Sequence, residues 1–394
     1  MKMQSWIAGI LVLLLICGCT TQEQQTMPSM DRDRLQNNQT VTGQETPGVK
    51  KEEPPLAPAA EKAEELLKNM TLEEKVGQMF LARCPENNAA EKAECYGLGG
   101  YVLFARDFEG QTPEGIRTKL QSYQDAVAVP MLISVDEEGG TVVRISRYDT
   151  FREERFLSPQ QLYVKGGLGA VAEDTIEKAN FLKALGINVN LAPVCDVSQE
   201  EKDFIYERAF GQDAENTAEY VKTVVAAMRE KKIGSVLKHF PGYGNNVDTH
   251  TGIAVDGRAW ETLQSADLLP FAAGIEEGAD AVLVSHNIVR CLDEENPASL
   301  SVNVHNLLRY TMGFEGVIMT DDLSMEAIRQ FAGDQEAAVA AVLAGNDMLC
   351  CTDFEIQIPA VIKAVENGIL KEEFIDDAVR RILQWKAELG ILSL

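Results

Sequence analysis

Histidine is scarce in this sequence, with four among 394 residues. No H-x-H or H-E-x-x-H pair occurs, so the histidine spacings typical of many metal-dependent hydrolases are missing. No C-x-x-C pair occurs either, which argues against a structural zinc site. A metal-dependent barrel hydrolase is still an alternative, but it would have to draw its ligands from distant positions: His239, His250, His286 and Asp321.

Basic residues are also few relative to acidic ones. Lys and Arg total 36 and Asp and Glu total 61, for a net charge of −25. Binding to nucleic acid or to another polyanion needs a basic face, so the charge balance argues against such partners. A neutral sugar substrate remains compatible with this charge.

The apolar run at the N-terminus is short for a membrane span, which needs about 20 residues. Residues 1–18 have Lys2 followed by an almost wholly apolar stretch over 7–17, as in a secretory signal peptide. The segment Leu15-Ile16-Cys17-Gly18-Cys19 resembles a bacterial lipobox, which would make Cys19 the lipid-bearing residue. The alternative is an uncleaved N-terminal anchor. Both interpretations place the body outside the cytoplasm, held at the cell membrane by its N-terminus.

Large apolar residues are sparse over residues 19–58, where Gln, Thr, Asn, Pro and Glu dominate. Such a segment cannot bury enough surface to offset its ordering entropy, so we interpret it as a disordered tether. Residues 59–394 are enough for one large domain. Cys84 and Cys95 flank a short polar stretch and could form a disulfide, although free thiols are equally compatible with the sequence.

Within the body, short apolar runs alternate with amphipathic helical stretches. Continuous apolar runs are typical of parallel strands covered by helices on both faces. Eight such runs over this length predict an α/β fold, a (β/α)8 TIM-type barrel in a single catalytic domain. An open doubly wound sheet is the alternative, but no G-x-G-x-x-G follows the first strand.

The expected strands are 78–82, 100–104, 130–135, 187–192, 235–238, 281–285, 316–320 and 347–350. The expected helices include 113–127, 170–185, 214–231, 267–277, 302–312, 335–344 and 354–366, with a closing helix over 371–389. Thr71 and Glu74 predict a capping box at the start of an earlier helix, and another helix is expected to start near Leu323.

Polar residues collect where the expected strands end, as the mouth of a barrel requires. Asp321 follows one strand directly and could act as a nucleophile, a general base or a metal ligand. An N-cap role is the alternative, and Asp322 fits that role at least as well. Asp248 and His250 are separated by one residue, so in an extended chain they share a face and could form a proton-transferring dyad.

Five further polar residues lie at or near these strand ends. A cation there needs an acceptor, which sugar hydroxyls or carboxylates supply, and a carboxylate accepts from hydroxyl donors. A set of structural ion pairs around the mouth is the alternative interpretation for each of them. The five are Asp136, Arg144, Arg208, Lys238 and His239.

Four motifs resemble those of the β-N-acetylhexosaminidases of glycoside hydrolase family 3. Residues 136–144 (DEEGGTVVR) are similar to the family's D-x-E-G-G-x-x-x-R, and residues 208–211 (RAFG) to its R-x-F-G. Residues 238–250 are similar to K-H-F-P-G…D-S-H, and residues 320–325 (TDDLSM) to S-D-D-L-S-M. Two departures are Thr249 in place of the usual Ser, and Tyr243 where His or Arg is common.

The resemblance implies a retaining exo-hydrolase that removes terminal β-linked N-acetylglucosamine, commonly from peptidoglycan fragments. It implies Asp321 as the nucleophile and His250 as the acid/base, supported by Asp248. The residues that would hold the sugar are Asp136, Arg144, Arg208, Lys238 and His239. We expect no cofactor or metal ion, and a monomer. The alternatives are a β-glucosidase or other exo-glycosidase of the same family, and a lipid-anchored sugar-binding protein without activity.

Overall fold

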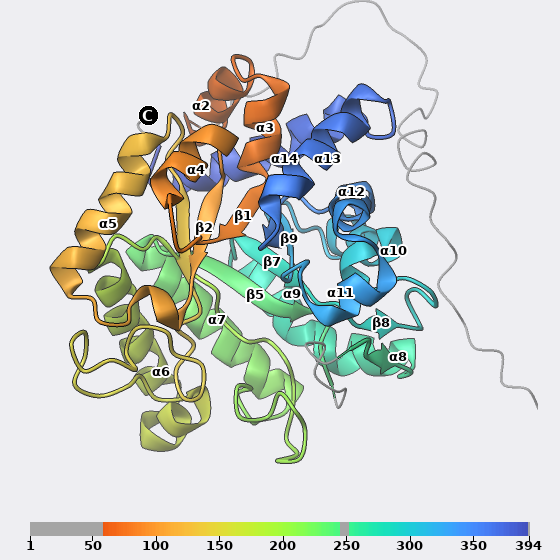
Figure 1. Ribbon diagram of the computed structural model, residues 1–394. Helices are drawn as coiled ribbons and strands as arrows, with labels where there is room; N and C mark the ends of the chain where they lie inside the picture. The colour runs from red at the N-terminus through yellow and green to blue at the C-terminus, as the bar shows by residue number, and fades with distance from the viewer. Residues whose placement is uncertain (1–57, 245–251, 393–394) are drawn as a thin grey trace, which may run out of the picture.

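The computed structural model describes residues 58–244 and 252–392, which form a barrel of parallel strands surrounded by helices (Figure 1). The predicted signal peptide, nearly all of the predicted tether, Cys19, Asp248 and His250 lie outside the described residues. Each of the eight expected strands is present, and most of their residues are buried. The strands are β1 (Phe80–Arg83), β2 (Gly100–Leu103), β3 (Leu132–Val135), β4 (Val189–Asn190), β5 (Gly234–Phe240), β7 (Ala281–Val284), β9 (Val317–Thr320) and β10 (Leu349–Cys351).

These strands are hydrogen-bonded in the order β10-β1-β2-β3-β4-β5-β7-β9, and every pair is parallel. A parallel bridge between Met319 and Met348 links β9 to the residues just before β10. The Thr320 amide donates to the Met348 carbonyl at 3.1 Å across this junction. The ring of strands therefore closes, which confirms the predicted TIM-type barrel and excludes the open sheet.

The helices mostly follow the predicted positions, since apolar spacing and caps fix them locally. Thr71 and Glu74 form the expected capping box at the start of α3. The helices are α2 (Pro58–Leu67), α3 (Leu72–Gln78), α4 (Ala89–Tyr96), α5 (Pro113–Ala126), α6 (Pro159–Ala184), α7 (Ala214–Lys231), α8 (Trp260–Thr262), α9 (Leu268–Glu276), α10 (Val302–Asn306), α11 (Glu326–Phe331), α12 (Asp334–Ala344), α13 (Phe354–Glu366) and α14 (Glu372–Glu388).

Three local features differ from the sequence-based expectation. The helix after Asp321 begins at Glu326 rather than near Leu323, and its N-cap is Met325. Helix α6 begins at Pro159 and is broken at Gly166 and Gly167, where the sequence predicted a helix only from residue 170. A short parallel pair, β6 (Val255–Asp256) with β8 (Ile288–Val289), lies outside the barrel sheet.

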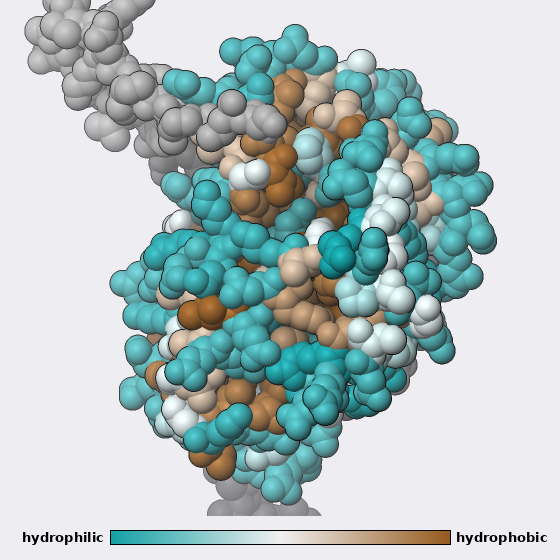
Figure 2. All heavy atoms as spheres, turned by 90° about the vertical axis from the view of Figure 1, so that its left-hand side faces the viewer, coloured by the Kyte–Doolittle hydropathy of each residue, from teal (hydrophilic) through white to brown (hydrophobic). Residues whose placement is uncertain are grey.

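The stretch between Cys84 and Cys95 is largely helix α4 rather than a polar loop. Cys84 is buried and Cys95 exposed, and all six cysteines of the described part are free thiols. None of the helices in residues 58–244 and 252–392 is long and apolar enough to cross a membrane. Figure 2 views the molecule from the side of α5, where the surface is mostly hydrophilic with a few hydrophobic patches.

Candidate active site

Charged side chains from three strands form one buried network at the mouth of the barrel. The Lys238 ammonium, at the end of β5, lies 2.7 Å from Asp136 Oδ1 and 2.6 Å from Glu138 Oε1, both beyond β3. Arg208 binds Glu138 through two nitrogens, at 3.0 and 2.7 Å. Arg144 reaches the other oxygen of Asp136 at 3.3 Å. Four of the predicted sugar-binding residues are therefore brought together.

The charges of this network hold its carboxyl groups ionised. Burial alone would raise the pKa of Asp136, but the Lys238 and Arg144 charges outweigh it and keep the pKa below its usual value. For Glu138, burial is likewise outweighed, by Arg208 and Lys238, and its pKa lies well below the usual range. Asp136 is thus an anion at neutral pH, able to accept hydrogen bonds from hydroxyl groups.

His239 is oriented by a carboxylate that the sequence analysis left without a role. Asp196 Oδ2 lies 2.8 Å from His239 Nδ1, and Arg208 Nη2 lies 3.0 Å from His239 Nε2. One tautomer satisfies both contacts: Nδ1–H donates to Asp196, and Nε2 accepts from Arg208. Asp196 also accepts from the backbone amides of His239 and Tyr243, at 3.1 and 2.7 Å, which fixes the start of the loop after β5.

Arg144 is positioned by another buried carboxylate, Glu137. This carboxylate accepts from the backbone amides of Arg144, Ile145 and Ser146, at 2.8, 2.8 and 3.2 Å. The segment after Gly140 therefore folds back over the end of β3. Gly139 permits the turn, because its φ is +103° and a Cβ there would lie 2.1 Å from the Leu157 carbonyl oxygen.

Asp321 emerges directly from β9, and its amide donates to the Val284 carbonyl at 3.0 Å. Its Oδ1 accepts from the Asp322 amide at 2.8 Å. Asp322 is more deeply engaged in local structure, since its Oδ1 accepts from the Ser324 amide at 2.9 Å and its carbonyl accepts from His286 Nε2 at 3.0 Å. Asp322 thus stabilises the turn after β9, whereas Asp321 occupies the strand end.

Carboxylates that follow β3 and β9 both act electrostatically on one buried thiol. Burial raises the pKa of the Cys350 thiol well above its usual value, and the charges of Asp322, Asp321 and Asp136 raise it further. The buried Cys350 thiol on β10 is therefore within electrostatic range of both Asp136 and Asp321. The candidate nucleophile consequently lies near the candidate sugar-binding network.

Arg258 links the described residues on the two sides of positions 245–251. This guanidinium binds Asp256 and Asp267, with nitrogen–oxygen distances of 2.7 to 3.1 Å, and reaches the Gly242 carbonyl at 3.4 Å. Burial raises the pKa of Asp267 to about 6, against the lowering effect of Arg258. The chain before position 245 and the chain after position 251 are thus held together by this guanidinium.

Glu138 and Asp196 are the two site residues that sequence reasoning missed. Glu138 could have been found from the third position of the D-x-E-G-G motif, where its neighbours were already suspected. Asp196 follows β4, as the other site residues follow their strands, but lies in no motif that was singled out. Of the histidines proposed as metal ligands, His239 and His286 lie in the described part of the chain. Neither of these two has a free ring nitrogen. His239 binds Asp196 and Arg208, and His286 binds the Ser299 hydroxyl and the Asp322 carbonyl.

Comparison with known proteins places this site in a family. The family description "Glycosyl hydrolase family 3 N terminal domain" matches residues 71–385. A beta-hexosaminidase from Xylella fastidiosa (strain M23) is 37% identical over 262 residues, which cover 64% of this chain and 75% of the relative.

Two solved structures are similar in fold and sequence. The glycoside hydrolase family 3 beta-N-acetylglucosaminidase from Paenibacillus sp. str. FPU-7 is 31% identical, with a TM-score of 0.76 over 82% of this chain and 65% of that one. This chain therefore spans slightly less than two thirds of that protein. The beta-N-acetylhexosaminidase from Beutenbergia cavernae DSM 12333 is 26% identical, with a TM-score of 0.70 over 82% of this chain and 99% of that one. From the match over residues 71–385, the chain belongs to glycosyl hydrolase family 3 and is a glycoside hydrolase.

Proposed function

We propose that this protein is a retaining exo-β-N-acetylglucosaminidase that removes terminal β-linked N-acetylglucosamine, with peptidoglycan fragments as its source. The network joining Asp136, Lys238, Glu138 and Arg208 is the observation that carries the proposal. It sets an ionised acceptor and several fixed donors around one point of the mouth, which suits a sugar ring with several hydroxyl groups. The names of the Xylella, Paenibacillus and Beutenbergia relatives support the choice of sugar.

In this proposal the network grips the non-reducing sugar. Asp136 accepts from sugar hydroxyls, because its lowered pKa keeps it ionised. Arg144 and Lys238 donate from either side of Asp136, and Glu138 holds Lys238 in place. Arg208 extends the grip from the β4 and β5 side, and His239, which Asp196 fixes, orients Arg208.

Catalysis would then proceed in two steps. The Asp321 carboxylate forms a bond to the anomeric carbon as the bond to the leaving oxygen breaks, and His250 gives that oxygen its proton. Water next attacks the anomeric carbon, His250 takes the proton, and Asp321 is released as a carboxylate. Asp248 would hold the imidazole in the productive tautomer. The roles of Asp248 and His250 rest on the sequence motif.

A pair of chromogenic substrates tests this proposal. We expect turnover of a 4-nitrophenyl β-N-acetylglucosaminide with retention, and much slower turnover of the matching β-glucoside. Preference for the β-glucoside would favour the alternative exo-glycosidase, and no turnover of either would favour a sugar-binding protein. Loss of activity after chelation, restored by added metal, would favour the metal-dependent alternative.

We also propose that Cys19 carries the lipid that anchors the protein outside the cytoplasm. The lipobox-like segment 15–19 supports this proposal. Radiolabelled palmitate should be incorporated into the full chain and not into a Cys19→Ala variant. Equal labelling of the two proteins, or an unprocessed N-terminus in both, would contradict the lipoprotein assignment.

A further inference from the structure

His286 is a fully buried histidine just beyond β7, and the proposed mechanism gives it no role. Its Nδ1 atom lies 2.8 Å from the Ser299 hydroxyl, on the short helix η4 (Ala298–Leu300). Its Nε2 atom lies 3.0 Å from the Asp322 carbonyl oxygen, in the turn after β9. One imidazole therefore joins the ends of β7 and β9, which are paired neighbours in the barrel.

The two partners decide which ring nitrogen of His286 carries the hydrogen. A backbone carbonyl can only accept, so Nε2–H donates to the Asp322 oxygen. In the neutral ring Nδ1 is then the acceptor, and the Ser299 hydroxyl donates to it. The reverse tautomer would set two acceptors, Nε2 and the carbonyl oxygen, against each other. His286 is thus a donor aimed at the Asp322 carbonyl.

Ser299, the second partner of the ring, is itself held in place. Its amide donates to the Ser285 carbonyl at 3.0 Å, and its carbonyl accepts from Asn346 Nδ2 at 2.8 Å. The same Asn346 nitrogen donates to the Ala341 carbonyl of α12 at 2.8 Å. Ser299 and Asn346 are both buried, so this arrangement is shielded from solvent. The imidazole is therefore oriented from the side of α12.

The carbonyl that His286 holds belongs to the residue whose amide holds the candidate nucleophile. The Asp322 amide donates to Asp321 Oδ1 at 2.8 Å. The Asp322 carbonyl accepts from His286 Nε2 and from the Met325 amide, each at 3.0 Å, and its two lone pairs can serve both donors. Fixing this carbonyl fixes the backbone of Asp322. It thereby fixes the direction in which the Asp322 amide holds the Asp321 carboxylate.

We propose that His286 is a positioning residue for Asp321, acting through the backbone of Asp322. Ser299 orients the imidazole for this task. The inference rests on the proposed function and deepens it, because it concerns the alignment of the proposed nucleophile. A carboxylate held in its attacking orientation reacts faster than one that must first be aligned. Loss of His286 should therefore slow the chemical step more than it weakens sugar binding.

The test compares three variants with the wild type. His286→Leu removes the donor to the Asp322 carbonyl, whereas His286→Gln keeps an amide N–H in its place. His305→Leu is the matched control, because His305 is also a buried histidine but its Nδ1 bonds the Ser301 carbonyl at 2.7 Å instead of the turn after β9. A loss of stability common to both histidines is thereby separated from an effect on Asp321.

On the chromogenic N-acetylglucosaminide, kcat should fall about 10- to 100-fold in His286→Leu, with KM and the inhibition constant of N-acetylglucosamine within about twofold of wild type. His286→Gln should recover part of this loss, and kcat of His305→Leu should stay within about twofold. An unchanged kcat in His286→Leu, or an equal fall in His305→Leu, overturns the proposal. Should His286→Leu fail to fold, Ser299→Ala should lower kcat roughly threefold at unchanged KM, and no fall would overturn the proposal.

Failure of the proposed function gives a different result, since the wild type would then not cleave the N-acetylglucosaminide at all. The contacts of His286 are in that case tested by NMR of the imidazole nitrogens. The chain has four histidines, so the signals of [15N]histidine that disappear in His286→Gln identify this ring. Shifts of the Nε2–H tautomer that change in Ser299→Ala support the positioning role, and a neutral Nδ1–H tautomer in the wild type refutes it.

Discussion

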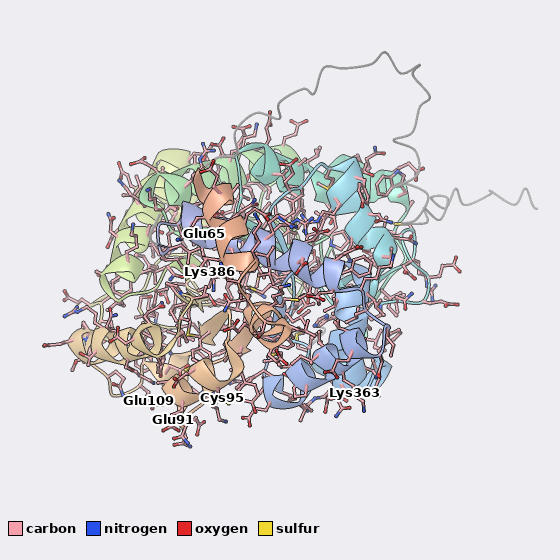
Figure 3. All side chains as sticks on the ribbon, turned by 90° about the horizontal axis from the view of Figure 1, so that it is seen from above. Glu65, Glu91, Cys95, Glu109, Lys363 and Lys386 are labelled. Carbon is pink, nitrogen blue, oxygen red and sulfur yellow. The ribbon has the colours of Figure 1, made fainter. Side chains whose placement is uncertain are left out.

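The two ends of the barrel both bury charge, but in opposite ways. At the mouth, the Asp136 and Glu138 carboxylates share the Lys238 ammonium. Neighbouring arginines bind the same two carboxylates. At the other end, Lys386 on α14 is fully buried, and its ammonium donates to the Gln78 side-chain oxygen at 2.7 Å without an ion pair among the described residues. Figure 3 looks onto this end, with Glu65 on α2 and Lys386 on α14 labelled.

The pKa values reflect this difference. The mouth carboxyls are shifted toward their charged forms by their partners, in spite of burial. Burial lowers the pKa of Lys386 to about 7, toward its neutral form. A pocket of about 590 Å³ at this end is lined largely by apolar residues of the segment 126–129 and of α4 and α13, together with a few carboxylates. The mouth is thus organised for polar chemistry, and the other end for closing the core.

Removing the candidate nucleophile should have the largest effect. Asp321→Asn should lower kcat by on the order of 10³-fold or more, because no other group replaces its attack. Asp322→Asn is the matched control and should retain most activity, since Asp322 supports the turn. If Asp322→Asn lost activity and Asp321→Asn kept it, the two assignments would be reversed.

The proposed acid/base should come next in size. His250→Ala should reduce turnover of an alkyl glycoside about 10²- to 10⁴-fold, because the leaving oxygen loses its proton donor. The pH–rate profile should also lose the limb that reports the imidazole. An unaltered profile at neutral pH would show that another residue transfers the proton.

Unpairing the mouth network should affect stability as well as activity. Lys238→Met leaves two buried carboxylates without their shared cation and should destabilise the fold by about 3–5 kcal/mol. In the wild type, the lowered pKa values of Asp136 and Glu138 contribute stability above pH 4 or so, which is lost as the pH falls below it. Urea unfolding at several pH values should show this acid-induced loss shrinking in Lys238→Met. An equal loss in both proteins would mean that the network does not control acid stability.

The smallest effect is expected at the opposite end. Lys386→Met removes a buried amine whose pKa is lower in the folded state than in the unfolded state. Wild-type stability should therefore rise between pH 7 and 9, as the folded protein releases this proton before the unfolded chain does. Lys386→Met should flatten that rise and raise Tm at pH 7 by roughly 2 °C. Lower stability of Lys386→Met at pH 7 would indicate that the Gln78 hydrogen bond outweighs the burial cost.

The barrel was predictable because its signals are local. Continuous apolar runs mark each strand, and α7 (Ala214–Lys231) and α13 (Phe354–Glu366) have the residues expected for them. The network itself depends on contacts distant in sequence, as between Lys238 and Asp136, so the sequence indicated four of its members but neither Glu138 nor the pairing. Asp196 could not be assigned, because it meets His239 only when the neighbouring strands pair. The turn at Asp322 misled the helix prediction, because a carboxylate that holds a turn and one that caps a helix have the same local sequence.

A covalent trap tests the central claim, that the mouth is a retaining glycosidase site with Asp321 as its nucleophile. The protein is incubated with a 5-fluoro-β-N-acetylglucosaminyl fluoride, and the digested product is mapped by mass spectrometry. The account predicts one added sugar on the peptide that contains Asp321, and none in Asp321→Asn. Labelling of a different residue, or activity on the chromogenic substrate without any adduct, would contradict it.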